Sequence, residues 1–209
     1  MKSIHAATSR IFLVGNGMSL NWTPVSELHP KMGVNKIGAL TDVEYYVKVD
    51  NTEFDGGEWK SEVMPFVEAG RPCLLWAGFR DEIGDRPNVT YVTRCKHHNV
   101  PEGHKDASPG WHEPFCTAWN SINIMAQWAV KLGFTEIVLV GCDLDFTDGK
   151  TDHFMPYYTK VDHGYRRRNN ANVMAAHRLI ARECPVPVYN GTIGGSLEVF
   201  PRVAVAALV

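Results

Sequence analysis

The sequence predicts an α/β fold of the Rossmann-like type, in which a mostly parallel sheet carries helices on both faces. Three observations lead to this prediction. Apolar runs alternate with helical segments along a chain of 209 residues, a length that suits a single domain. The runs 11–14 and 137–140 do not alternate apolar with polar residues, which is typical of parallel strands buried on both faces. Apolar residues make up 44% of the chain, enough for an ordinary core.

Seven strands are expected in chain order. They cover residues 11–15, 32–37, 44–50, 72–77, 89–93, 136–141 and 186–189. A short helix is expected to start at Thr23 and Pro24, because Thr can cap a helix and Pro fits its first turn. A weaker helix covers 58–68. Two stronger helices, over 117–132 and 169–183, carry apolar residues at helical spacing.

Residues 94–114 lack periodicity and are rich in Pro, Gly, His and charged residues. A loop of this length in a compact domain is usually functional or disordered. We interpret it as a lid or loop insertion in one nucleotide-binding domain that spans residues 1–209. Its histidines match no metal-ligand spacing, so a solvated lid or partner loop is favoured over a metal site.

Charge, hydropathy and cysteine pattern restrict the class of protein. The net charge of −2 argues against the broad basic surface of a nonspecific nucleic-acid binder. No apolar run approaches the roughly 18 residues of a membrane span, and the first run is too short for a signal peptide. Five scattered cysteines without a CxxC pair predict reduced, mostly buried thiols. We therefore expect a cytoplasmic protein without nucleic-acid partners and leave a homo-oligomer open.

The first motif of interest directly follows the first strand and contains Gly15, Asn16, Gly17 and Ser19. Two glycines allow the backbone to approach a ligand closely, and exposed backbone amides can hold phosphate oxygens. The motif is not a GxGxxG fingerprint, because position 20 is Leu, and no Gly-Lys-Ser/Thr follows to make a P-loop. A tight strand-to-helix turn is the alternative interpretation.

Polar residues also stand at other strand ends and at a helix start. They are Asn35, Asp50, Asn51, Asn120, Ser121 and Asp143. An isolated Asn at a strand end is most often a turn former. The carboxyl ends of parallel strands meet at one edge of the sheet, where ligands bind in open α/β folds. We therefore expect these residues to face a single crevice together with the loop 15–19.

The order of these motifs resembles that of bacterial sialyltransferases of glycosyltransferase family 42. The similarity covers about residues 11–154 with a gap over 94–114, and the last of its motifs is Gly141, Cys142 and Asp143. In that family the Gly-Asn-Gly-Pro-Ser-Leu loop, the downstream Asn residues and the helix-start Ser hold the cytidine monophosphate part of CMP-sialic acid. Met18 stands where the family has Pro, and the stretch 146–153 lacks the two tyrosines that steady the leaving phosphate there.

This resemblance implies inverting transfer from a nucleotide-sugar donor to a hydroxyl of a small-molecule or glycan acceptor. The family uses a His before its last helix as the base, and His163 lies in about that place, with His153 as a second candidate. Histidine titrates near neutrality and can take a proton from a hydroxyl. The arginines 166–168 could clamp a phosphate or carboxylate, or form an exposed basic start to the helix. His177, within the last helix, is interpreted as structural.

A second resemblance gives an alternative. Residues 141–149 with His153, and the loop 190–195, are similar to segments of a large uncharacterised family that includes archaeal-type 6-hydroxymethylpterin diphosphokinases. It implies pyrophosphoryl transfer from ATP to a pterin-like alcohol, which would need Mg²⁺. We nevertheless interpret the acidic cluster as loop acids and assign no metal ligand; its members are Asp143, Asp145, Asp148 and Asp152. A nucleotide-binding protein without turnover is the third possibility.

Overall fold

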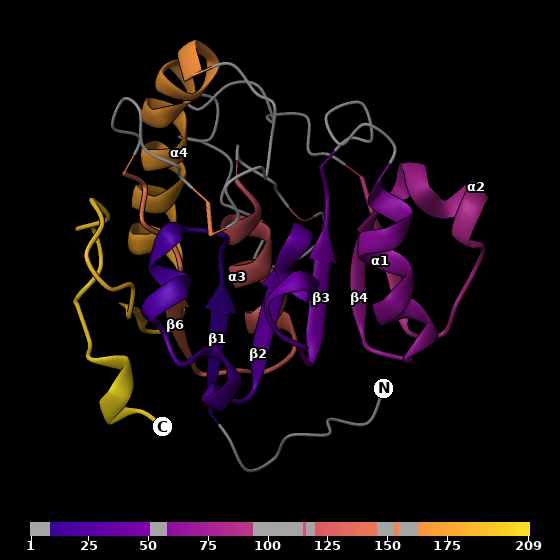
Figure 1. The fold of residues 1–209 in the computed structure, drawn as a ribbon, viewed down its shortest axis with the longest axis horizontal. Helices are drawn as coiled ribbons and strands as arrows, with labels where there is room; N and C mark the ends of the chain where they lie inside the picture. The colour runs from indigo at the N-terminus through magenta and orange to yellow at the C-terminus, as the bar shows by residue number, and fades with distance from the viewer. Residues whose placement is uncertain (1–8, 51–57, 94–114, 116–119, 146–152, 155–162) are drawn as a thin grey trace.

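The computed structural model describes residues 9–50, 58–93, 115, 120–145, 153–154 and 163–209, and for 163–172 the backbone but not the side chains. Within these ranges a seven-stranded sheet, parallel in every pair, forms the centre of one α/β domain (Figure 1). The strands are β1 (Arg10–Val14), β2 (Lys31–Val34), β3 (Tyr45–Lys48), β4 (Cys73–Trp76), β5 (Val89–Val92), β6 (Glu136–Val140) and β7 (Val188–Asn190). The predicted Rossmann-like fold class is confirmed.

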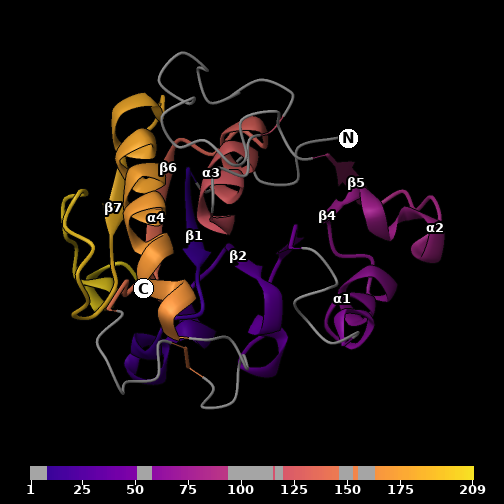
Figure 2. The same ribbon diagram turned by 90° about the horizontal axis from the view of Figure 1, so that it is seen from above.

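Helices cover both faces of the sheet. The α-helices are α1 (Trp59–Glu68), α2 (Arg80–Ile83), α3 (Ser121–Lys131) and α4 (His163–Glu183). In β1, Ile11 and Leu13 join the core under α3 and α4, whereas Phe12 and Val14 join the core under α1. Figure 2 shows α3 and α1 on opposite sides of the strands. This two-sided burial explains why the strands read as unbroken apolar runs. Within the described ranges, no helix is long and apolar enough to cross a bilayer.

Short 3₁₀ helices follow several strands. They are η1 (Met18–Trp22), η2 (Val25–Glu27), η3 (Asn35–Ala39), η5 (Ala77–Phe79) and η7 (Val205–Ala207). The strand expected over 32–37 was predicted too long: β2 ends at Val34, because Asn35 has φ +54° and starts η3. A left-handed residue ends an extended strand, and Asn tolerates this conformation better than most residues.

Three predicted helix starts were wrong. The helix expected over 117–132 begins at Ser121, because Asn120 is its N-cap. The helix expected at Thr23 and Pro24 is the 3₁₀ helix η2, and the Thr23 hydroxyl donates to the carbonyl of Ser19, 2.8 Å away, instead of capping it. The last helix begins at His163, six residues before the expected start at 169. The apolar periodicity starts late in this helix, but the three arginines before it are good helix formers and extend the helix backwards.

The strand order is β5-β4-β3-β2-β1-β6-β7. The chain builds the sheet outwards from β1 to β5 and then returns to place β6 on the other side of β1, with Val14 paired to Val140. The direction of winding thus changes between β1 and β6. In open α/β sheets, the crevice at the carboxyl ends of such strands is where ligands bind.

Candidate functional site

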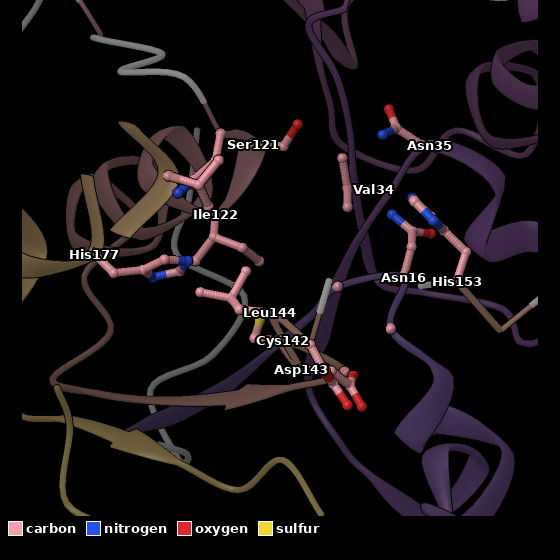
Figure 3. Close-up of a pocket in the computed structure, with 16 residues that line it drawn as sticks. Asn16, Val34, Asn35, Ser121, Ile122, Cys142, Asp143, Leu144, His153 and His177 are labelled. Carbon is pink, nitrogen blue, oxygen red and sulfur yellow. The ribbon is translucent and has the colours of Figure 1, made fainter. Parts of the chain in front are cut away.

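A crevice of about 190 Å³ lies at this switch point. Its walls come from the loops after β1, β2 and β6, from the start of α3 and from one side of α4. Figure 3 shows Asn16, Asn35 and His153 on one side and Ser121, Ile122 and His177 on the other. Eight residues predicted from the sequence line this crevice: Gly15, Asn16, Gly17, Asn35, Asn120, Ser121, Asp143 and His153.

The remaining predicted residues are not among the described residues that line the crevice. Ser19 is 1% exposed and lies behind the crevice wall, hydrogen-bonded to Asp143. Asp50 comes shortly after the end of β3 but is not among the described residues that line the crevice. Asn51 and the loop 94–114 lie outside the described residues, as does the side chain of His163, whose backbone is the first residue of α4.

The two glycines in the loop after β1 allow this loop to pack closely against the end of β6 and the loop that follows it. The Gly15 N–H donates to the carbonyl of Val140 and the Gly17 N–H to that of Gly141, each at 2.8 Å. A Cβ atom on Gly15 would lie 2.4 Å from the Gly141 carbonyl oxygen, and one on Gly17 only 1.7 Å from Oδ2 of Asp143. The expectation that exposed amides of this loop hold phosphate oxygens is therefore wrong for these two groups. Ligand contacts fall to side chains instead.

Asp143 locks the two loops together. Its Oδ1 accepts from the Ser19 N–H at 3.0 Å and its Oδ2 from the Ser19 hydroxyl at 2.9 Å. Burial raises the pKa of Asp143, and the Ser19 hydrogen bonds offset this only in part. In Figure 3 its carboxylate points away from Asn35 and Ser121. Asp143 thus acts as a structural latch between the loops after β1 and β6.

A magnesium site receives no support from the described part of the chain. No group of three or more His, Cys, Asp or Glu side chains there could hold a metal ion. Asp148 and Asp152, the other members of the acidic cluster with Asp143 and Asp145, lie outside the described residues.

The loop after β7 holds the β6 loop from its other side. The Cys142 N–H donates to the Thr192 hydroxyl at 3.1 Å, and the Ser196 N–H donates to the Asp143 carbonyl at 2.7 Å. The Asn190 side chain holds this turn by donating to the Leu197 carbonyl and accepting from the Thr192 N–H. The segment 190–195 thus supports the crevice wall. Burial raises the pKa of the Cys142 thiol, which agrees with the expected packing role.

Unpaired polar atoms gather at the crevice. Among the described residues, none forms a hydrogen bond to Oδ1 of Asn16, Oδ1 of Asn35, Nδ2 of Asn120 or Nδ1 of His177, although all four atoms are buried. Buried polar groups are normally paired, and leaving one unpaired costs about 1–3 kcal/mol. Four such atoms around one crevice suit a polar ligand that supplies both donors and acceptors.

Each of the three asparagines is held by a hydrogen bond from another residue. Asn120 is the N-cap of α3, where its Oδ1 accepts from the Asn123 N–H at 2.8 Å and leaves Nδ2 for the crevice. The carbonyl of Asn35 accepts from the Tyr46 hydroxyl at 2.8 Å. The carbonyl of Asn16 accepts from the Phe154 N–H at 2.9 Å, which brings the preceding His153 beside Asn16.

His177 belongs to the crevice wall, which sequence reasoning missed. Its side chain is 1% exposed and packs edge-on against Phe200, with ring centroids 6.1 Å apart. Burial lowers its pKa to about 4, so the imidazole is neutral at pH 7. It follows Val173, another lining residue, by one helical turn. That spacing is the one signal in the sequence that could have placed it on the crevice side of α4.

Comparison of the chain with models of protein families, with curated proteins and with solved structures gives no significant match. The function of the crevice is therefore argued from its own geometry and from the motifs described above.

Replacing Asp143 tests the latch. Asp143→Ala leaves the buried Ser19 N–H and hydroxyl without their acceptor, so the free energy of unfolding should fall by about 1–3 kcal/mol. Asp143→Asn keeps an acceptor for the N–H and offers its own NH₂ to the hydroxyl oxygen, so its stability should stay near wild type. Urea unfolding measures both. Equal stability of Ala and Asn variants would contradict the latch.

Titration of His177 should be visible in stability. Below pH 6.5 the unfolded chain takes up a proton that the folded chain does not, so the free energy of unfolding falls between about pH 6.5 and 4. The gap between the two pKa values corresponds to about 3 kcal/mol lost at pH 4. Urea unfolding at several pH values should show a flatter profile for His177→Leu than for wild type. Parallel profiles would show that His177 protonates as easily folded as unfolded.

Proposed function

We propose that the crevice binds the nucleoside monophosphate part of a nucleotide-sugar, and that the protein transfers the sugar to a hydroxyl acceptor. The observation that carries this proposal is the set of four buried, unpaired polar atoms at the switch point of a parallel sheet. The order of motifs shared with glycosyltransferase family 42 supports cytidine monophosphate as the nucleotide.

The crevice chemistry suits a ribose and phosphate. Each amide of Asn16, Asn35 and Asn120 offers one acceptor and two donors, which can bind ribose hydroxyls and phosphate oxygens respectively. The Ser121 hydroxyl lies in the same wall. The first turns of α4 carry the arginines 166–168, and the same helix lines the crevice further along. Arginine is suited to neutralise a phosphate.

The proposed reaction is a single displacement with inversion. The acceptor oxygen bonds to the anomeric carbon as the bond from that carbon to the phosphate oxygen breaks, and the phosphate leaves with the electron pair. A neutral imidazole takes the hydroxyl proton. His163 is the proposed base, and His153, which lies beside Asn16, is the second candidate. The alternative reaction is pyrophosphoryl transfer from ATP to a pterin-like alcohol, which differs from the sugar transfer in needing Mg²⁺.

Asn120→Asp separates ligand binding from folding. Aspartate still caps α3 through one oxygen, so the stability of the free protein should not fall, but its second oxygen replaces a donor with a negative charge. The affinity for cytidine monophosphate should therefore fall at least about tenfold. Asn120→Ser, which keeps a cap without the charge, should weaken binding less. Isothermal titration calorimetry gives both affinities.

A thermal-shift screen across CMP, CDP, UDP, GDP and ATP, with and without Mg²⁺, provides the control. A ligand at 100 times its dissociation constant adds about 2.7 kcal/mol of stability. Stabilisation by CMP without Mg²⁺ is the expected result. Stabilisation by ATP with Mg²⁺ alone, or unchanged CMP affinity in Asn120→Asp, would overturn the proposal. If the protein binds CMP but transfers no sugar, it would be a nucleotide-binding protein without turnover.

The proposed role of His163 as the general base is tested by measuring the rate of sugar transfer. His163→Ala should lower sugar transfer by roughly 10²–10⁴-fold and leave CMP affinity near wild type, since a base acts on the acceptor hydroxyl. His153→Ala is the matched variant on the described wall of the crevice. A loss of turnover in His153→Ala alone would move the role to that residue, and full activity in both would exclude a histidine base at either position.

A further inference from the structure

A second, larger cavity adjoins the crevice. It has a volume of about 540 Å³ and lies between η3 and the start of α1, beside the carboxyl ends of β2 and β3. We call it the α1 cavity; Asn35 lines both it and the crevice. Its volume is within the usual range of about 300–1,000 Å³ for small-molecule sites, whereas the crevice alone is smaller than that range. A ligand bound in the crevice can thus extend past Asn35, or meet a second molecule there.

Glu62 is the buried charge of the α1 cavity. Its side chain is 8% exposed, and its Oε2 accepts from Nζ of Lys48, itself 1% exposed, at 2.8 Å. Its Oε1 is buried and accepts no hydrogen bond from the described residues. Nζ of Lys36 lies 3.8 Å from that oxygen, close enough for an ion pair but too far for a hydrogen bond, and donates instead to Glu58.

The cavity offers acceptors to a ligand. Oε1 of Glu62 and Oδ1 of Asn35 are both buried acceptors without a donor among the described residues. The carboxylates of Asp42, Glu58 and Glu62 line the cavity, and each is in an ion pair, with Arg71, Lys36 and Lys48 respectively. Because these cations already have carboxylate partners, the described lining favours a group that donates hydrogen bonds over a phosphate. Hydrogen bonds to an ionised carboxylate are stronger than those between neutral groups.

We infer that the α1 cavity binds an amine-bearing group without phosphate, which donates to Oε1 of Glu62. This inference rests on the proposed function only for the ligand in the adjoining crevice. The amine has two sources: the exocyclic amine of a nucleobase that extends from the crevice, or the amino group of a separate sugar substrate. Both sources present N–H donors to the same carboxylate.

Matched pairs of probes test the inference on the full chain. Cytidine and uridine differ at C4 by an exocyclic amine in place of a carbonyl oxygen, and glucosamine and glucose differ by an amine in place of a hydroxyl. In calorimetric titrations, the amine-bearing member of at least one pair should bind the wild-type protein about tenfold more tightly. A preference in the nucleoside pair identifies a nucleobase, and a preference in the sugar pair identifies a second substrate. Equal binding within both pairs would overturn the inference.

Two variants test whether the preference for the amine-bearing probe arises in the α1 cavity. Glu62→Gln should abolish it, whereas Glu58→Gln, the same change at a side chain that is 68% exposed, should retain it. Glu62→Gln also removes the partner of buried Lys48, so Ala39→Phe serves as a second variant. Ala39 is exposed and lines the cavity, so a phenyl ring there fills the space without touching the buried ion pair. A preference that survives Ala39→Phe would overturn the inference.

Failure of this inference is distinguishable from failure of the proposed function. Loss of the amine preference in Ala39→Phe is measured with phosphate-free probes, whereas the crevice is measured with CMP and Asn120→Asp. CMP binding without an amine preference overturns the inference alone. An amine preference without CMP binding overturns the proposed nucleotide site alone.

Discussion

The close approach of the β1 loop to the β6 loop is the constraint on which the site depends. Gly15 and Gly17 have no room for a Cβ atom, because the Gly141 carbonyl and the Asp143 carboxylate occupy that space. The same contact uses the N–H groups of both glycines and of Ser19. Backbone groups that could have bound a ligand therefore hold the two strands together. Under the proposed function, recognition would depend on the amide side chains that line the crevice.

Much of the fold was predictable, because its physical cause is local in the sequence. A strand buried on both faces reads as an unbroken apolar run, and β1 and β6 were located in this way. The errors occurred where conformation depends on one residue, as at Asn35, whose left-handed φ ends β2. The start of α4 was missed for the opposite reason: helix-forming arginines extend it without an apolar stripe.

The candidate site was predictable to the extent that sheet topology determines it. Residues after β1, β2 and β6 converge because parallel strands end at one edge, and Asn120 joins them through its cap. The roles of individual residues were not predictable. The glycines pack against β6, and Asp143 binds Ser19. His177 faces the crevice only because of how α4 docks, which a single sequence does not specify.

Asn35 separates the two cavities with one side-chain amide. An amide presents its acceptor in one direction and its donors in the other, and rotation by 180° about χ2 exchanges them. A ligand that fixes the amide orientation in the crevice therefore also fixes the hydrogen-bond polarity that the α1 cavity presents. Occupancy of either cavity would then alter the affinity of the other by the same factor, as thermodynamic linkage requires. Ligands bound in both cavities would then be coupled through the orientation of this one amide.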